Sequence, residues 1–382
     1  MVSLPGSRRT DLNARKRADS HRRWHADETF NKPAFHAQRE GRNDFHMNRP
    51  GQSLIPKGVA IRLPEEAARR RATERKSLAL FERRGYQEII TPTFEYLDVF
   101  SLGTADTHLD HAYKFVDRAT GRMMMLRPDV TPQIARTAAT LLHDRPRPLR
   151  LCYSANVFRH AEAHEGRERE IFQIGTELIG APGIDADVEA IALAIDLLRT
   201  LGLSSFKVVL GQMAFTRGVL APFAVMPEAF EKILDAVAKK KAATLDAALR
   251  LPGIDATLRQ AVLSLPHLYG GREVLKTAKP FATQSACWKG LSRLCAVYEK
   301  LVERGDEARL GIDLGETRGF NYYTGVVFEI FAGGAGSALG GGGRYDGLLE
   351  KFGHPAPAIG FAVDVERLQM ALDHASSLAR SR

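Results

Sequence analysis

The sequence contains no uninterrupted apolar run close to the roughly 20 residues that a membrane-spanning helix needs, so we expect no transmembrane segment. The stretch from Met1 to Asp11 also lacks the apolar core of a secretory signal. Cysteine is scarce, and Cys152, Cys287 and Cys295 are too scattered for a disulfide framework or a zinc knuckle. In a chain of 382 residues that is 44% hydrophobic and 26% charged, these absences favour a globular cytoplasmic protein with reduced thiols.

The excess positive charge is concentrated near the start of the chain. The formal net charge is +9, and residues 1–50 hold 11 Lys/Arg against 6 Asp/Glu. This segment also carries four histidines and no apolar periodicity, so we predict a disordered basic leader at 1–53. A basic arm can bind nucleic acid, but an unstructured leader or a gene start placed too far upstream is the simpler interpretation. We therefore expect no nucleic-acid partner and no membrane contact.

Hydrophobic periodicity predicts strands in runs, with helices segregated between them. A helix is expected to begin at Pro64 and to stop at Gly85. The segments with the character of strands are 86–92, 123–126, 150–159, 170–179, 310–314 and 326–332. The strands on either side of the polar loop 160–169 should pair antiparallel. This pattern indicates an α+β fold around an antiparallel sheet.

The interval between residues 206 and 309 has a mainly helical pattern. Two apolar stripes at helical spacing predict core packing there: Phe230, Ile233, Leu234 and Val237, and then Leu291, Leu294, Tyr298 and Leu301. We therefore divide the ordered chain into a first part of the core at 54–205, a mainly helical insertion at 206–309, and a second part of the core at 310–382 that ends in a terminal helix.

Polar side chains within strand-like segments mark a candidate pocket. Gln173, Gly175 and Glu177 alternate along one strand, so they share a face and the glycine leaves room between the two polar groups. Burying such groups is costly unless they are partnered, which favours a pocket over a solvent-facing polar strand. The glycines at 340–343 either line a place where a ligand approaches the backbone or form a hairpin bend.

Several common catalytic and cofactor patterns are missing. The sequence has no G-x-x-x-x-G-K-S/T loop and no Rossmann G-x-G-x-x-G after a strand. His160 and His164 have the spacing of a ligand pair but lie in a polar loop, so we expect no metal site. No Ser-His-Asp or Cys-His arrangement is visible from spacing. The absence of these patterns therefore predicts no cofactor.

Five short segments resemble, in the right order, the motifs of the class II aminoacyl-tRNA synthetase fold in its histidyl branch. Residues 86–95, with Pro92, resemble the dimer-interface motif 1, and residues 158–177, with Arg159, resemble motif 2. The remaining segments are 359–368, which resembles motif 3 and contains Arg367, and 318–323 and 342–346, which resemble the two histidine-specific motifs. The resemblance covers about residues 54–370 and implies an antiparallel sheet flanked by helices and a dimer formed through motif 1.

Two families share these motifs: histidyl-tRNA synthetase, and the regulatory subunit of ATP phosphoribosyltransferase. The sequence ends soon after motif 3, without room for an anticodon-binding domain, and 129–133 and 264–275 look like segments of the regulatory family. Asp364 also stands where the synthetase has a glycine, so its carboxylate should crowd and repel a nucleotide. Against this, Arg159 and Arg367 are retained as vestigial nucleotide-site arginines, and Asn321 replaces the usual aspartate of its motif.

The resemblance to the regulatory family implies a non-catalytic chain that a short-form catalytic subunit needs for activity and that binds free L-histidine for feedback inhibition of the first step of histidine biosynthesis. The histidine-binding residues that it implies are Asp129, Thr131, Gln173, Glu177, Arg318 and Tyr323. The first three would bind the ammonium group, Arg318 the carboxylate, and Glu177 with Tyr323 the imidazole. The alternative is a truncated histidyl-tRNA synthetase or a paralogue that adenylates an amino acid.

Overall fold

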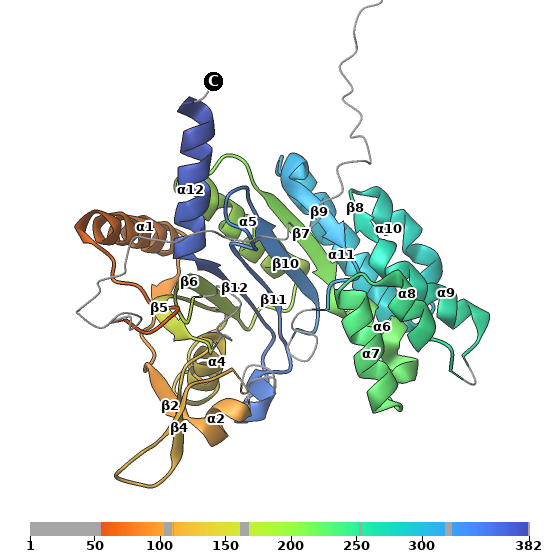
Figure 1. The fold of residues 1–382 in the computed structure, drawn as a ribbon, viewed down its shortest axis with the longest axis horizontal. Helices are drawn as coiled ribbons and strands as arrows, with labels where there is room; N and C mark the ends of the chain where they lie inside the picture. Colours follow the sequence, from red (N-terminus) through yellow and green to blue (C-terminus); the bar gives the residue numbers. More distant parts are fainter. Residues whose placement is uncertain are drawn as a thin grey trace, which may run out of the picture. The chain divides into compact units, whose positions relative to one another are not determined.

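A nine-stranded mixed sheet organises the chain (Figure 1). The computed structural model describes residues 55–102, 109, 111–160, 168–251, 254–317 and 323–380, so the predicted basic leader lies outside the described residues. In sheet order the strands are β1 (Gln87–Glu88), β5 (Leu149–Phe158), β6 (Glu170–Ile179), β12 (Ala358–Asp364), β11 (Gly340–Arg344), β10 (Val326–Phe331), β7 (Lys207–Gln212), β9 (Leu310–Asp313) and β8 (Tyr269–Gly270). A second sheet has the order β2 (Phe94–Tyr96), β4 (Met123–Leu126) and β3 (Lys114–Val116).

The pairing directions confirm the expected sheet. All neighbours from β5 through β6, β12, β11 and β10 to β7 are antiparallel. Beyond them, β1 pairs with β5 and β9 pairs with β7 in parallel, and the edge strand β8 pairs antiparallel with β9. The predicted antiparallel partnership of 150–159 with 170–179 is the β5–β6 pair. The glycine-rich segment is the central strand β11, so the interpretation of 340–343 as a hairpin bend is wrong.

The helices in the described residues are α1 (Pro64–Arg83), α2 (Leu97–Ser101), α4 (Thr131–Thr140), α5 (Ile184–Thr200), α6 (Met213–Leu220), α7 (Pro227–Ala238), α8 (Ala242–Ala248), α9 (Ala256–Ser264), α10 (Glu273–Thr277), α11 (Ser285–Glu303) and α12 (Val365–Arg380). Short 3-10 turns are η1 (Ala221–Phe223), η2 (Leu265–His267), η3 (Lys279–Phe281), η4 (Glu307–Arg309) and η5 (Leu349–Phe352). The boundaries predicted for the first helix are confirmed, since Pro64 opens α1 and Gly85 follows it with a φ of 80°. None of the described helices combines the length and the apolar character needed to cross a membrane.

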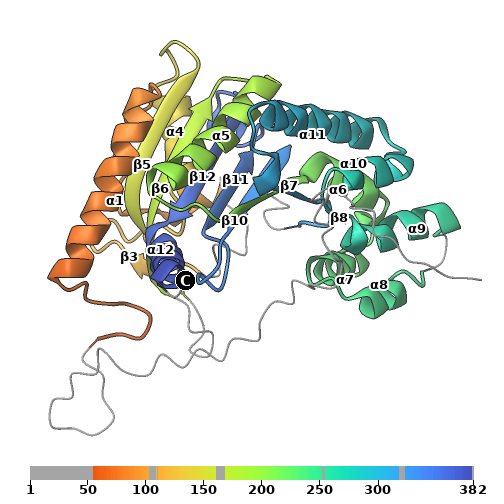
Figure 2. The same cartoon turned by 90° about the horizontal axis from the view of Figure 1, so that it is seen from above.

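The two faces of the sheet are covered by different helices. The helices α1, α5 and α11 pack against one face, where even-numbered residues of β6 such as Phe172 and Ile174 enter the main core (Figure 2). The opposite face packs against α4 and η5 through alternate residues of β5, including Leu151 and Tyr153. The odd-numbered residues of β6 therefore lie on the α4 face.

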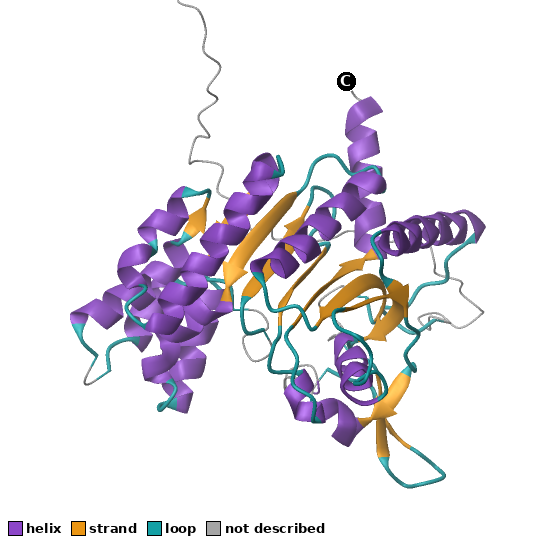
Figure 3. Cartoon of the chain, turned by 180° about the vertical axis from the view of Figure 1, so that it is seen from behind, coloured by secondary structure: helices purple, strands orange, loops and turns teal. Residues whose placement is uncertain are grey.

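Most helices of the interval 206–309 gather at one end of the sheet (Figure 3). Ile233 and Val237 of α7 and Leu291, Leu294, Tyr298 and Leu301 of α11 are buried, which confirms that the two predicted stripes are core. The interval opens with β7, a strand of the main sheet, because its alternating valines and leucine pack beside β10.

Candidate functional site

The strand register places the predicted pocket residues on the α4 face of the sheet. Glu177 of β6 pairs with Gly360 of β12 on one side, and Gly175 pairs with Tyr153 of β5 on the other. Directly paired residues share a face, so Gln173, Gly175 and Glu177 all point toward α4. The predicted common face is therefore present.

Glu177 is a buried acid with two hydroxyl donors. It is only 1% exposed. The hydroxyl of Thr131, the first residue of α4, donates to Oε1 at 2.5 Å, and the hydroxyl of Tyr345 donates to Oε2. Burial raises the pKa of Glu177 to about 8, and these two hydrogen bonds offset only part of that effect. Gly360 is required beneath it, because a Cβ at that position would overlap Oε2.

Tyr153 fills the space that Gly175 leaves open. A Cβ on Gly175 would lie 2.5 Å from both Cζ and the hydroxyl oxygen of Tyr153. The phenol is 1% exposed, and within the described part of the chain its hydroxyl has no hydrogen-bond partner. The neighbouring Thr131 hydroxyl donates to Glu177. Burial raises the pKa of Tyr153, and its interaction with the Thr131 side chain opposes part of that shift. A buried hydroxyl without a partner at the centre of this face is a polar group available to a ligand.

Asp129 and Tyr323 lie beside Glu177. Asp129 Oδ1 accepts the backbone N–H of Thr131 at 3.2 Å, which fixes the carboxylate at the start of α4. Burial raises the pKa of Tyr323, and the nearby negative charges of Asp129 and Glu177 raise it further. The structure thus brings four of the predicted residues together: Asp129, Thr131, Glu177 and Tyr323.

The other two predicted histidine-binding residues, Gln173 and Arg318, are not part of this group. Gln173 is two residue pairs from Glu177 along the same face and lies opposite Asp364 of β12. Arg318 lies outside the described residues, as does Asn321. The position of the predicted carboxylate ligand therefore remains a prediction.

The two predicted nucleotide-site arginines are engaged by the protein itself. Arg159 donates from Nε to the Pro128 carbonyl at 2.9 Å. Arg367 Nε lies 3.1 Å from Asp364 Oδ2, and its Nη1 donates to the Ala338 carbonyl at 3.0 Å. Asp364 is 4% exposed, and burial raises the pKa of this carboxyl while Arg367 opposes the shift.

Asp364 belongs to a cluster of three acids. The carboxylates of Glu168, Asp364 and Glu366 lie within 4.8 Å of one another. Arg62 contacts Glu168 at 3.2 Å and Arg70 contacts Glu366 at 3.5 Å, in addition to the Arg367 pair. Because three arginines face three acids, the cluster forms a balanced ion-pair network.

A cavity of about 630 Å³ lies away from these residues. Its lining comes from α2, β3 and β4 and their neighbours: Leu97, Asp98, Ser101, Leu109, Lys114, Arg122 and Met123. None of the predicted ligand residues that the structure describes contributes to it, and several of the side chains that line it are charged and exposed. The convergent polar groups around Glu177 therefore define the candidate site better than this cavity does.

Two residues of the site were not predicted, namely Tyr153 and Tyr345. Tyr345 lies within the segment 342–346, but nothing in its spacing identifies Glu177 as its partner. The signal for Tyr153 was Gly175, since a glycine inside a strand often marks the close approach of a neighbouring group. Finding the tyrosine requires the β5–β6 register, which pairs these two residues directly.

Comparison with known proteins defines the class of the fold. A family model described as histidyl-tRNA synthetase matches residues 58–368. The histidine–tRNA ligase subunit from Alicyclobacillus acidocaldarius aligns with a TM-score of 0.73 at 28% identity, covering 85% of this chain and 99% of that one. The fold is thus that of a class II synthetase of the histidyl type.

More similar relatives narrow the assignment. A protein named ATP phosphoribosyltransferase regulatory subunit from Moorella thermoacetica is 46% identical over 317 residues, which cover 83% of this chain and 81% of the relative. One from Geobacter metallireducens is 39% identical over 333 residues, covering 87% and 77%. A structure described as an ATP phosphoribosyltransferase regulatory subunit/histidyl-tRNA synthetase from Bacillus halodurans C has a TM-score of 0.76 at 31% identity and covers 85% of this chain and 84% of that one.

The chain belongs to the family of ATP phosphoribosyltransferase regulatory subunits within this histidyl-tRNA synthetase-like group. The family resemblance inferred from the motifs is confirmed. The names of the relatives also fit the expectation of a non-catalytic subunit.

The raised pKa of Glu177 predicts a pH-dependent stability. Between about pH 4.5 and pH 8 the folded chain retains the Glu177 proton and the unfolded chain loses it, so this group's contribution to the free energy of unfolding falls as pH rises. We expect the free energy of unfolding of Glu177→Gln to decrease by several kcal/mol less than that of the parent chain over this pH range. Urea unfolding at pH 5 and pH 8 measures the difference, and Asp364 and Glu366 cancel because both proteins keep them. If the free energy of unfolding changed equally between pH 5 and pH 8 in the parent and in Glu177→Gln, the raised pKa assigned to Glu177 would be wrong.

The fit between Gly175 and Tyr153 predicts a second effect. We expect Gly175→Ala to lower the free energy of unfolding by about 1–3 kcal/mol, because the added methyl group meets a buried ring and the Phe361 carbonyl. Gly347→Ala is the matched control, since a Cβ there meets no atom within 4 Å. It should change the stability by less than about 0.5 kcal/mol. Similar losses in both variants would show that Tyr153 does not occupy this space.

Proposed function

We propose that this chain is the histidine-binding regulatory subunit of a cytoplasmic ATP phosphoribosyltransferase, that a short-form catalytic subunit requires it for activity, and that L-histidine in its pocket inhibits the complex. The chain itself has no catalytic turnover in this proposal. The observation that carries it is the buried Glu177 carboxyl, held between Thr131 and Tyr345 and surrounded by further polar groups.

The groups around Glu177 complement an imidazole. With a pKa of about 8, the empty site keeps Glu177 largely protonated near neutral pH. An imidazole N–H beside it supplies a further hydrogen-bond donor and favours the ionised carboxylate. The Tyr323 hydroxyl serves the second ring nitrogen. A ligand without these nitrogens leaves the buried acid unpaired, which is how such a site discriminates against other amino acids.

The start of α4 complements the ammonium group. When a ligand stabilises the ionised Glu177, the Thr131 hydroxyl donates its proton to this carboxylate and presents only lone pairs to the ligand. An ammonium group has three donors and no acceptor, so it matches this hydroxyl together with the Asp129 carboxylate and the Gln173 amide oxygen. In the proposal Arg318 binds the ligand carboxylate with its planar fork.

The state of the nucleotide-site arginines favours regulation over adenylation. The Asp364 carboxylate occupies Arg367, and the same carboxylate adds negative charge where the phosphates of ATP would have to lie. Histidine-dependent ATP–pyrophosphate exchange by the purified chain would support the alternative of a truncated synthetase or an adenylating paralogue. Histidine binding without exchange supports the regulatory function.

Inhibition follows from linkage between binding and conformation. A ligand shifts a complex toward the state that it binds more tightly, and its differential affinity limits the size of the effect. If histidine binds the inactive state of the hetero-oligomer more tightly, then filling the pocket lowers activity even though no group of the pocket touches the substrates.

Reconstitution with a short-form ATP phosphoribosyltransferase from the same source tests the function. The parent chain should activate the transferase, and added L-histidine should inhibit this activity. We expect Glu177→Gln to retain the activation and to weaken histidine binding by at least about tenfold, because the amide cannot replace a buried charge-assisted acceptor. Isothermal titration calorimetry gives the affinity, and the activity assay gives the inhibition.

A matched control separates the pocket from a general loss of acidic groups. Glu189→Gln removes a carboxylate that binds Arg150 and Tyr86 away from the pocket, so histidine sensitivity should stay parental. A parent chain that neither activates the transferase nor releases heat with histidine would overturn the proposal.

We also propose that the chain self-associates through the motif 1 region. Three exposed apolar residues, Ile90, Phe94 and Phe115, are called here the apolar patch; Phe94 and Phe115 lie on the small sheet, and Ile90 lies in the segment that leads into it. Ile90 is 88% exposed, and the rings of Phe94 and Phe115 meet edge to face at 6.1 Å. Exposed apolar side chains in one segment of the chain are typical of a protein interface, and a second copy of the chain is the partner that the motif 1 resemblance implies.

The patch gives a test of self-association. Ile90→Asp should shift the chain from dimer to monomer in sedimentation velocity, because a charge inside an apolar interface is costly to bury. Val225→Asp is the control, since Val225 is 83% exposed on the helical part of the chain, away from motif 1. A dimer that withstands Ile90→Asp would exclude this surface.

A further inference from the structure

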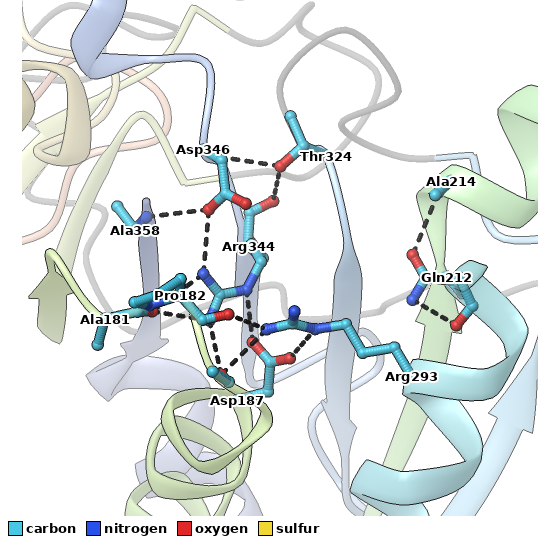
Figure 4. Close-up of polar contacts among 12 residues, drawn as sticks. Ala181, Pro182, Asp187, Gln212, Ala214, Arg293, Thr324, Arg344, Asp346 and Ala358 are labelled. Carbon is cyan, nitrogen blue, oxygen red and sulfur yellow. Dashed lines mark hydrogen bonds and ion pairs between the residues drawn. The ribbon is translucent and has the colours of Figure 1, made fainter. Parts of the chain in front are cut away.

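A second buried carboxylate lies outside the pocket, on α5. Asp187 has no exposed surface, and its two oxygens are divided between arginines from distant parts of the chain (Figure 4). Arg344 of β11 donates from Nε to Oδ1 at 2.7 Å, and Arg293 of α11 donates from Nε to Oδ2 at 2.5 Å. Because a buried carboxylate is costly without charged donors, the shared acid fixes the two guanidinium groups relative to each other.

Arg344 connects this acid to the segments that carry the pocket tyrosines. It is 2% exposed, and its Nη1 lies 3.0 Å from Asp346 Oδ1, which also accepts the backbone N–H of Ala358 at 3.1 Å. The Arg344 carbonyl accepts the backbone N–H of Thr324 at 2.7 Å, and the Thr324 hydroxyl accepts the backbone N–H of Asp346 at 2.9 Å. These bonds lock the turn after β11 to the segment that precedes β10 (Figure 4).

The locked segments hold two pocket residues directly. Tyr345, which donates to Glu177, stands between Arg344 and Asp346 in the chain. Tyr323 immediately precedes Thr324. A displacement of the Arg344 guanidinium would therefore be passed along one or two peptide units to the hydroxyl groups that face the ligand.

Arg293 contacts the connection that follows the strand of Glu177, the acceptor of the Tyr345 hydrogen bond. Its Nη2 donates to the carbonyls of Pro182 and Gly183 at 2.9 and 3.0 Å, in the connection between β6 and α5. The guanidinium of Arg344 binds the Ala181 carbonyl in the same connection at 3.2 Å. Strand β6, which ends just before this connection, carries Glu177.

We propose that Arg293 and Asp187 are positioning residues for the ligand pocket, through which α11 holds Tyr345 against Glu177. The inference rests on the proposed function for its affinity readout. Arg293 and Asp187 position the donor Tyr345 through Arg344. They position the acceptor Glu177 through the connection after β6. An imidazole then meets a carboxylate whose second oxygen is already satisfied, and no binding energy is spent on ordering the site.

The ion pairs of Arg304 also connect the end of α11 with α5, but they lie far along α5 from the connection after β6. Arg304, just beyond α11, pairs with Asp196 near the other end of α5 and with the buried Asp306 at 3.0 Å. None of these three residues adjoins a pocket residue in the chain, and none hydrogen-bonds to a pocket residue that the structure describes. Arg304 therefore offers a matched control, because it ties the same two helices without contacting the pocket segments.

The test compares Arg293→Lys and Arg293→Met with Arg304→Met in the full chain. Lysine retains the charge for Asp187 but cannot also reach the carbonyls of Pro182 and Gly183, while methionine removes both interactions. We expect both Arg293 variants to weaken L-histidine binding in calorimetry by about tenfold, with a smaller loss for lysine, and Arg304→Met to leave the affinity parental. Urea unfolding reports the stability of each variant.

Two further measurements separate positioning from a general structural role. In chains labelled with 3-fluorotyrosine, the ¹⁹F resonance that disappears in Tyr345→Phe should move in the Arg293 variants and stay in place in Arg304→Met. In a double-mutant cycle, Tyr345→Phe should weaken histidine binding less in Arg293→Met than in the parent chain, because the two residues act on the same hydrogen bond.

The outcomes distinguish this inference from the proposed function. Folded Arg293 variants with parental histidine affinity and an unmoved Tyr345 resonance overturn the positioning role, as does an equal response of Arg304→Met. A parent chain that binds no histidine overturns the proposed function, and the ¹⁹F resonance alone then decides whether Arg293 positions Tyr345.

Discussion

The burial of the Glu177 carboxyl in the middle of a sheet is the constraint on which the arrangement of the site depends. An acid in this position needs hydrogen-bond donors, and none is available from the paired main chain of β6. The two donors come from the start of α4 and from the turn after β11. Satisfying one carboxyl therefore fixes a helix on the face of the sheet and the end of a strand within it.

The acid of the candidate site and the acids around Asp364 have neighbours of opposite character. Around Glu177 the neighbours are hydroxyl groups, which leave the acid free to respond to a charged or hydrogen-bonding ligand. Around Asp364 the neighbours are arginines, which satisfy the acids internally. A region whose charges are already paired gains little from a new ion, so the surroundings of Glu177 and those of Asp364 differ in what they can bind.

The sequence was sufficient for the local features of the fold and for part of the site. Period-two alternation located β5 and β6, and it placed Gln173, Gly175 and Glu177 on one face because that geometry is local. The partners of these residues were not accessible in the same way. Tyr345 is 168 residues from Glu177, and Arg344 is 157 residues from Asp187, so each contact depends on the order and register of the whole sheet. The strand at 340–344 was also missed, because four consecutive glycines have no alternation and low intrinsic strand preference.

The glycines of the central strands set a limit on how the pocket can evolve. Gly175, Gly360 and Gly343 lie in or beside the rows of paired residues that contain Glu177 and Tyr153, so main chain rather than side chains forms the base there. No substitution can remove atoms from a glycine, so replacing one of these glycines can make the pocket shallower but never deeper. Replacing these glycines can therefore adapt the pocket only to a smaller ligand, while a bulkier ligand would require the strands to move apart or a neighbouring side chain to be shortened.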